Sequence, residues 1–297
     1  MKIIDEEAVR GLLQMKDLIP TMASALADLS SKKAVQPVRM VLPVADHKGF
    51  LGVMPAYNGA LGAKIVTFYP YNKGIHTHHG VIMLFRPETG EPMAVIDGRL
   101  ITEMRTAAAS AMATDLLARR DASVLAIIGS GVQAHSHLEA IGLVRKISEI
   151  RVWSPRNAQA FADTHDGVKA VDRAEDAVRG ADIVVVATSS DIPVLLGKWL
   201  SPGIHINAVG ANRPTWRELD DVALAASKIF VDSREAAVIE SGDVIAVGRM
   251  FAEIGEVVSG AMPGRESDDE ITLFKSLGAA VEDIAAADLV YKRAIAV

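Results

Sequence analysis

The chain has 297 residues, a formal net charge of −6 and no cysteine, and half of its residues are hydrophobic. This length fits two domains, and the acidic balance argues against nucleic acid as a partner. The lack of cysteine excludes disulfides, Cys-bound zinc and thiol catalysis. We recognise neither a signal peptide nor an apolar run that could span a bilayer, so a cytoplasmic protein without a membrane partner is expected.

The first hundred residues change pattern once. Residues 1–30 carry apolar side chains at helical spacing, and the pattern ends in a polar break at 30–33. Beyond it, short apolar runs separated by Gly and Pro predict antiparallel strands. These runs are 38–42, 50–54, 64–68, 81–85 and 93–96, with the last two joined as a hairpin by the turn at 86–90.

An alanine-rich segment follows and ends near Arg119. Its composition predicts a long helix, with Thr102 as the expected N-cap. We expect this helix to join two domains.

From Val124 onward, strand-like and helix-like segments alternate. Apolar, β-branched runs occur at 124–128, 150–153, 183–187, 204–209 and 229–231. This rhythm predicts an α/β fold, a Rossmann-type doubly wound parallel sheet, spanning 114–274. Residues 1–113 are expected to form a smaller α+β domain, completed by residues 275–297, where a helix is expected over 274–294.

A dinucleotide fingerprint follows the first of these strands. Gly129 permits a tight turn, Gly131 lets the backbone approach a pyrophosphate, and Ala134 keeps the next helix close to the strand. The first helical residues, Val132 and Gln133, present free N–H groups and a partial positive charge to phosphates. A glycine turn alone is a weak signal, but here the strand before it and the helix after it are both present.

The end of the second strand indicates which dinucleotide binds. NAD sites usually carry a carboxylate there, whereas this chain has Ser154, Arg156 and Asn157. These side chains suit a 2′-phosphate, so NADP(H) is favoured and NAD(H) stays possible. The alternative is that Arg156 is only a solvated surface residue.

Polar loops follow two further strands. Thr188 and Ser189 come after the strand at 183–187, and Val209 and Asn212 after the strand at 204–209. Carboxyl ends of parallel strands border the ligand crevice of such folds, so both loops are candidate ligand contacts. Thr188, Ser189 and Val209 are expected to contact the coenzyme, and Asn212 the substrate. Either loop could equally be ordinary surface.

Three cations have apolar surroundings. Arg39 and Lys64 lie in strand-like runs, and Arg105 lies near the start of the alanine-rich helix. A buried cation is costly unless it is paired or lines a cavity, and converging cations would suit a substrate carboxylate. The alternatives are an edge-strand lysine and an arginine at a helix end.

The run from His76 to His79 suggests metal, but the set of ligands is incomplete. We therefore expect no metal and interpret the run as a loop near the coenzyme. Hydrolase elbows and the P-loop lysine are absent.

With these residues in view, the chain resembles the ornithine cyclodeaminase/mu-crystallin family, and most of all its ketimine reductase branch. The resemblance covers nearly the whole length in ordered blocks. They are GVMPAYN (52–58), KIVTFY (64–69), AVIDGRLITEMRTAAASAMAT (94–114), GSGVQAHSH (129–137), PGIHINAVGANRPTWRELDD (202–221), VDSREAAVIESGDV (231–244) and LFKSLGAAVED (273–283).

The resemblance implies roles for particular residues. It implies that Arg39, Lys64 and Arg105 grip a substrate carboxylate, that Glu240 lines the pocket, and that the first domain forms a homodimer. The implied coenzyme contacts are Thr77, His78, Arg105, Thr106, Ser154, Arg156, Asn157, Thr188, Val209 and Ser276.

One position departs from the family pattern. Ornithine cyclodeaminases carry a catalytic Asp where this chain has Asn212, and a neutral amide is a poor base. The expected activity is therefore NAD(P)H-dependent reduction of a small 2-imino acid to an amino acid, with Lys64 as proton donor. Alternatives are cyclodeaminase, alanine dehydrogenase or hydroxyproline dehydratase chemistry, or a protein that binds NADPH and a small carboxylate without turnover.

Overall fold

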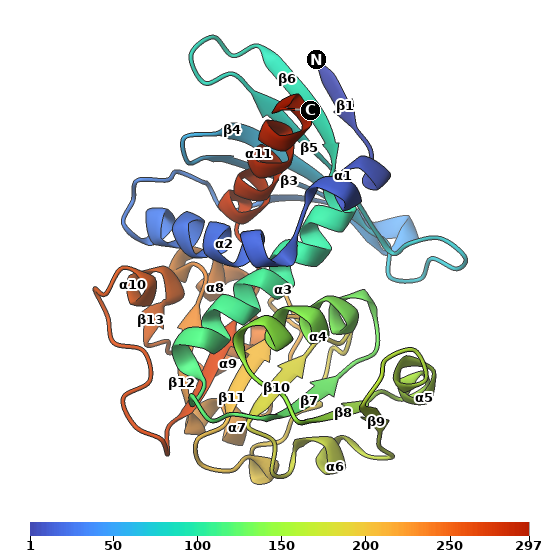
Figure 1. Ribbon diagram of the computed structural model, residues 1–297, viewed down its shortest axis with the longest axis vertical. Coiled ribbons are helices and arrows are strands. Elements are labelled where there is room, and N and C mark those ends of the chain that lie inside the picture. The colour runs from blue at the N-terminus through green and yellow to red at the C-terminus, as the bar shows by residue number, and fades with distance from the viewer. Residues whose placement is uncertain (297) are drawn as a thin grey trace. The chain divides into compact units, whose positions relative to one another are not determined.

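The computed structural model describes residues 1–296 and divides into two compact units (Figure 1). The first unit comprises Met1–Arg105 and the chain end from Gly278, and the second comprises Thr106–Leu277. The sequence placed these divisions at 113/114 and 274/275. Helix α3, Gly98–Leu117, runs without interruption through the first boundary, so no local sequence signal marks it.

The first unit contains a mixed sheet in the order β1-β6-β5-β4-β3-β2. The predicted antiparallel strands and the hairpin between β5 and β6 are confirmed. Strand β1 was not predicted, and it pairs in parallel with β6. The elements are β1 (Lys2–Ile4), α1 (Glu6–Leu12), α2 (Met15–Ser30), β2 (Met40–Val44), η1 (Ala45–His47), β3 (Gly49–Tyr57), β4 (Leu61–Phe68), β5 (His78–Phe85), β6 (Pro92–Asp97) and α11 (Ala280–Ala296).

Helix α11 packs on one face of this sheet, against β3, β4 and β5. Lys64 points to that face, in register with Met54 and Ile82 on the neighbouring strands. A Cβ atom on Gly62 would lie 2.8 Å from Ile284 of α11, so the glycine allows the close approach of the helix. Because β4 lies between β3 and β5, the edge-strand alternative for Lys64 is wrong.

The second unit contains a fully parallel sheet in the order β13-β12-β14-β11-β10-β7-β8-β9. The chain winds outward from β7 in one direction and from β10 in the other, which confirms the doubly wound fold. The elements are β7 (Val124–Ile128), α4 (Val132–Val144), β8 (Glu149–Trp153), α5 (Ala158–Ala162), β9 (Val168–Ala170), α6 (Ala174–Val178), β10 (Ile183–Val186), η2 (Gly197–Trp199), β11 (His205–Ala208), α7 (Asp221–Ala226), β12 (Ser227–Val231), α8 (Arg234–Glu240), α9 (Gly242–Val247), β13 (Ala252–Glu253), α10 (Ile254–Val258) and β14 (Ile271–Lys275).

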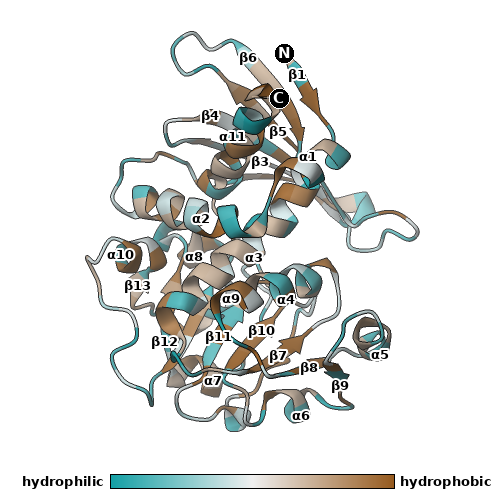
Figure 2. Cartoon of the chain, viewed as in Figure 1, coloured by the Kyte–Doolittle hydropathy of each residue, from teal (hydrophilic) through white to brown (hydrophobic). Residues whose placement is uncertain are grey.

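The central strands β7 and β10 are apolar on both faces, as is typical of strands covered by helices. Figure 2 shows β7 in the brown of hydrophobic residues. One face, with Ile128 and Val186, packs on α6 and α7. On α3, Thr114 accepts a hydrogen bond from Asn207 of β11, and Ser110 contacts the buried ring of His137 on α4.

Two sequence predictions about element boundaries were wrong. The predicted helix over 274–294 is a strand to Lys275 and a helix only from Ala280, because the segment that includes Phe274 and Lys275 pairs between β11 and β12. Thr102 is not an N-cap. It lies inside α3, where its hydroxyl donates to the carbonyl of Gly98, while Asp97 accepts from the N–H of Leu100.

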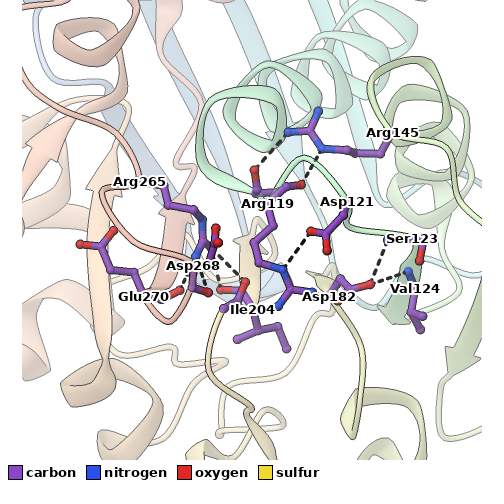
Figure 3. A network of polar contacts seen from close by, with 12 residues as sticks. Arg119, Asp121, Ser123, Val124, Arg145, Asp182, Ile204, Arg265, Asp268 and Glu270 are labelled. Carbon is purple, nitrogen blue, oxygen red and sulfur yellow. Dashed lines mark hydrogen bonds and ion pairs between the residues drawn. The ribbon is translucent and has the colours of Figure 1, made fainter.

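The amino ends of the parallel strands are held by a polar network (Figure 3). The Asp182 carboxylate accepts hydrogen bonds from the backbone of Ser123 and Val124 and pairs with Arg119 at 2.5 Å. Arg145 donates to carbonyls at the end of α3, including Thr114 and Ala118. This edge of the sheet is thus occupied by structural contacts, whereas the glycine turn lies at the opposite edge.

Candidate active site

Lys64 and Arg105 share a pair of buried carboxylates in the first unit. Lys64 Nζ lies 2.6 Å from Asp283 Oδ2, and Arg105 Nε lies 2.9 Å from Asp283 Oδ1. Arg105 Nη1 lies 3.1 Å from Glu282 Oε2. All four side chains are almost completely buried, so these ion pairs form where water screens them little.

The two carboxylates belong to the first turn of α11. The backbone N–H of Ala279 donates to Glu282 Oε2 at 2.8 Å, which satisfies one free donor at the helix start. The partial positive charge of a helix N-terminus favours anions there. Local helix physics thus places Glu282 and Asp283 where the packing of α11 on β4 brings them to Lys64.

Arg39 reaches the same region from the segment that precedes β2. Its Nη2 donates to the carbonyl of Gly278 at 2.9 Å. Gly278 has a φ of 81°, and a Cβ atom there would lie 2.7 Å from Arg105 Nη2. The positive φ and the nearby Arg105 guanidinium both favour glycine at this position, and the Gly278 carbonyl holds Arg39 at the same turn.

The basic cluster, defined as Arg39, Lys64 and Arg105, carries three positive charges against two carboxylates. Three cations in one region suit a ligand that carries a carboxylate. Burial, with contributions from Arg105 and Arg39, lowers the pKa of Lys64 to about 8, and Asp283 opposes this shift. Lys64 is therefore a mostly protonated group close to its titration point at neutral pH.

His78 lies close enough to this cluster to be affected by its charge. Burial and the charges of Lys64 and Arg105 lower the pKa of His78 to about 3, so its imidazole is neutral. His78 and His79 begin strand β5 instead of forming the expected loop, because they pair with Phe68 and Thr67 of β4. Thr77 is exposed and immediately precedes the strand.

The glycine turn, residues 129–131, has the geometry that a dinucleotide needs. Gly129 has a φ of 116°, and a Cβ atom there would overlap the carbonyl oxygen of Ala187. Gly131 has open space at its Cβ position, which leaves room for a pyrophosphate. Helix α4 begins at Val132 without a side-chain cap, so its first N–H groups stay available to an anion.

The segment after β8 presents polar groups beside this turn. Ser154 Oγ accepts hydrogen bonds from the Ser130 hydroxyl and from the backbone of Asn157, at 2.8 and 3.1 Å. Arg156 is exposed and makes no ion pair or hydrogen bond within residues 1–296. Its guanidinium is thus available to an incoming phosphate.

Three further strands of the parallel sheet end in residues that were expected to contact the coenzyme or, for Asn212, the substrate. Thr188 and Val209 are half-buried behind β10 and β11, whereas Ser189 and Asn212 are exposed. Ser276 follows β14, and its hydroxyl is buried without a hydrogen-bond partner among the described residues. An orphaned hydroxyl at the carboxyl end of a strand fits a position that a ligand would satisfy.

Two other residues are buried, namely Thr106, an expected coenzyme contact, and Glu240, an expected pocket residue. Thr106 lies in α3, directly after the boundary between the units. Glu240 is the last residue of α8 and is 8% exposed, so it is not a surface charge of that helix.

The structure thus groups the expected residues into two sets, one in each unit. Arg39, Lys64, Arg105 and His78 belong to the first unit, and the glycine turn with the loops behind β8, β10, β11 and β14 belongs to the second. Sequence reasoning missed the carboxylates Glu282 and Asp283. Acidic residues in the first turn of a helix are common on protein surfaces, so their residue type alone did not indicate a buried role. Their position shortly after Gly278 was the one sequence feature that could have drawn attention to them.

The described residues, 1–296, contain no group of three or more His, Cys, Asp or Glu side chains that could hold a metal ion. No helix in that part of the chain is long and apolar enough to cross a membrane.

A parallel sheet with a glycine turn at its switch point, together with a second α+β unit, defines the class of Rossmann-type, NAD-binding dehydrogenase folds. The model of the ornithine cyclodeaminase/mu-crystallin family matches residues 2–297. The chain belongs to this family.

Known relatives are similar over almost their full lengths. Ketimine reductase mu-crystallin of Mus musculus is 48% identical over 298 residues, which cover 96% of this chain and 95% of the relative. The Δ1-pyrroline-2-carboxylate reductase of Thermococcus litoralis, solved with NADH and L-proline, has a TM-score of 0.97 and 40% identity, covering 100% and 98% of the two chains. An archaeal alanine dehydrogenase dimer with bound NAD has a TM-score of 0.95 and 37% identity, covering 100% and 96%.

Proposed function

We propose that this chain is an oxidoreductase that reduces a small 2-imino carboxylic acid to the corresponding amino acid with NAD(P)H. The observation that carries the proposal is the basic cluster, in which Lys64 and Arg105 are buried and held in place by Glu282 and Asp283. Relatives named ketimine reductase and Δ1-pyrroline-2-carboxylate reductase support it.

Each residue of the cluster has a distinct role in this reaction. A bound nicotinamide dinucleotide supplies the hydride, which goes to the imine carbon. Arg39 and Arg105 hold the substrate carboxylate and fix the orientation of the C=N bond. The Lys64 ammonium, held by Asp283, donates the proton that the imine nitrogen needs. Neutral His78 adds no further charge to the site.

The residue at 212 argues against cyclodeaminase chemistry. Asn212 has an amide, which cannot take a proton from a substrate amine or from water. Amino acid dehydrogenase chemistry is a second candidate, because the chain has a TM-score of 0.95 to the archaeal alanine dehydrogenase. That reaction differs by its need for free ammonia.

A coenzyme-oxidation screen tests the proposal. Loss of NADPH absorbance is followed with Δ1-pyrroline-2-carboxylate, its six-membered homologue, and pyruvate with ammonia or methylamine. We expect turnover of the imino acids and none of 1-pyrroline, the matched imine without a carboxylate. Release of ammonia or water without coenzyme oxidation, or tight binding of imino acids with no turnover at all, would refute the assignment.

We propose NADP(H) as the preferred coenzyme, although the solved relatives contain NADH or NAD. Support comes from Arg156, which is exposed and unpaired within residues 1–296, and from the lack of a carboxylate after β8. An Arg156→Ala variant is expected to bind NADPH about tenfold more weakly, as loss of one charged hydrogen bond predicts, and NADH equally well. Calorimetric titration of both coenzymes measures this, and an equal loss for both would contradict it.

We propose a homodimer built on the first unit. The sheet face opposite α11 carries an apolar row in cross-strand register, Met40, Val53, Ile65 and Val81, of which Met40 is 63% and Val81 42% exposed. A second copy of this chain would cover these side chains. Sedimentation velocity should show a dimer, and a Val81→Glu variant should sediment as a monomer. A wild-type monomer at micromolar concentration would overturn the proposal.

A further inference from the structure

Glu218 is a buried carboxylate that joins two loops of the second unit. Its Oε1 accepts hydrogen bonds from the backbone N–H and the hydroxyl of Thr188, at 2.9 and 2.7 Å. Its Oε2 accepts from the backbone N–H groups of Gly210 and Ala211, at 2.7 and 2.9 Å. One side chain thus fixes the loop behind β10, residues 188–190, to the loop behind β11, residues 209–212.

Two further buried charges hold Glu218 in place. Asp243 Oδ1 accepts from the backbone N–H groups of Glu218 and Leu219, both at 3.2 Å. Lys275 Nζ lies 3.3 Å from Asp243 Oδ2 and 3.9 Å from Glu218 Oε2. Burial raises the pKa of Glu218, and Lys275 and the donated hydrogen bonds oppose that rise. Four donors directed at one carboxylate favour its ionised form.

The bridged loops lie beside the glycine turn. A Cβ atom on Gly129 would lie 3.6 Å from Thr188 Cγ2 and would overlap the carbonyl of Ala187. A Cβ atom on Gly210 would overlap both the Thr188 backbone and the Glu218 carboxylate. The loops are therefore packed around Glu218 with no spare room, at the point where the strand order reverses between β7 and β10.

A doubly wound sheet binds the two halves of a dinucleotide on its two halves. Ser154 and Arg156 follow β8 on one side of the glycine turn, and the bridged loops follow β10 and β11 on the other side. If the first side takes the adenosine half, the bridged loops border the nicotinamide half.

We propose that Glu218 is a positioning residue that sets the nicotinamide side of the coenzyme site by bridging the 188–190 and 209–212 loops, an inference that rests on the proposed function. It touches neither coenzyme nor substrate and acts through the backbone of Thr188, Gly210 and Ala211. Every contact of the bridge is made by groups of the second unit itself, so we expect folding to order these loops.

The test compares two ligands on a Glu218→Gln variant. Gln has the same size, but its NH2 group must face either the N–H groups of Gly210 and Ala211 or the N–H and hydroxyl of Thr188, so at least one backbone N–H loses its acceptor. We expect the affinity for NADPH to fall about tenfold or more, the range for hydrogen bonds to a charged group. The affinity for 2′-phospho-ADP-ribose, which lacks nicotinamide, should stay within about twofold, well below the effect of one such bond. Calorimetry gives both dissociation constants.

A matched control separates positioning from general loss of stability. Asp182 also bridges backbone N–H groups through a carboxylate, but at the amino ends of the strands (Figure 3). Asp182→Asn should lower the melting temperature and leave the ratio of the two affinities unchanged. A Glu218→Asp variant keeps the charge beside Lys275 but is one methylene shorter, and it should shift the ratio in the same direction by a smaller factor.

Each outcome has a definite meaning. The positioning role would be overturned if Glu218→Gln lost affinity equally for both ligands, or if it kept the wild-type affinity for NADPH. If Glu218→Gln gives no folded protein, the ratio of the two affinities is measured in Glu218→Asp instead. A ratio equal to that of the wild-type protein would overturn the proposal. Failure of the wild-type protein to bind either NADPH or NADH would instead refute the proposed function.

Discussion

Replacing Lys64 with methionine is expected to lower kcat for imine reduction by about 100- to 1,000-fold, within the range for loss of a general acid. Lys64 is the one ammonium of the basic cluster, and its pKa of about 8 suits it to give up a proton near neutral pH. Methionine has a similar length and can pack beside Met54 and Ile82, and Arg105 still pairs with the Asp283 carboxylate that Lys64 leaves. Steady-state coenzyme oxidation measures the effect. A kcat within a few-fold of wild type would remove Lys64 from the mechanism.

The same residue predicts a pH dependence. The ammonium form is the proton donor, and it is present below the lowered pKa and lost above it. The kcat of the wild-type protein should therefore fall as pH rises through about 8. A Lys64→Arg variant cannot lose its proton in this range, so its residual activity should show no such alkaline fall. An identical fall in both proteins would assign the titration to another group, such as the substrate imine.

Replacing Arg105 with methionine is expected to reduce both stability and kcat/KM. Removing one partner of a buried ion pair costs about 3–5 kcal/mol, because a charge is left uncompensated. Arg105 is 5% exposed and contacts both Glu282 and Asp283. Loss of the guanidinium also removes a charged grip on the substrate carboxylate, which predicts a further loss in kcat/KM of about 10- to 100-fold. Urea unfolding and steady-state kinetics measure the two effects.

A second substitution separates the two roles of Arg105. In the double variant Arg105→Met with Glu282→Gln, the uncompensated carboxylate becomes neutral, and its oxygen can still accept from Ala279. The pair of Lys64 and Asp283 is left intact. We expect much of the lost stability to return, while kcat/KM stays low. Recovery of both would mean that Arg105 has only a structural role.

The sequence by itself determined the parts of this protein that depend on local chemistry. The apolar run that ends in Gly129 and Gly131 specified a strand, a turn and a helix, because a positive φ and an open Cβ position need glycine at those places. Alternating apolar runs likewise specified the antiparallel strands of the first unit and the parallel strands of the second. These patterns act over a few residues, so they can be recognised without the fold.

Only the tertiary structure decided which charges meet. Lys64 and Asp283 are far apart in the chain, and they meet because α11 packs against β4. Strand β14 was missed for a related reason. Its short run, ending in Phe274 and Lys275, is ambiguous alone and becomes a strand because β11 and β12 pair with it on both sides. Lys275, buried in this strand, lies close to the carboxylates of Glu218 and Asp243. Buried ionic contacts of this kind follow no regular spacing in the sequence, so they cannot be recognised without the fold.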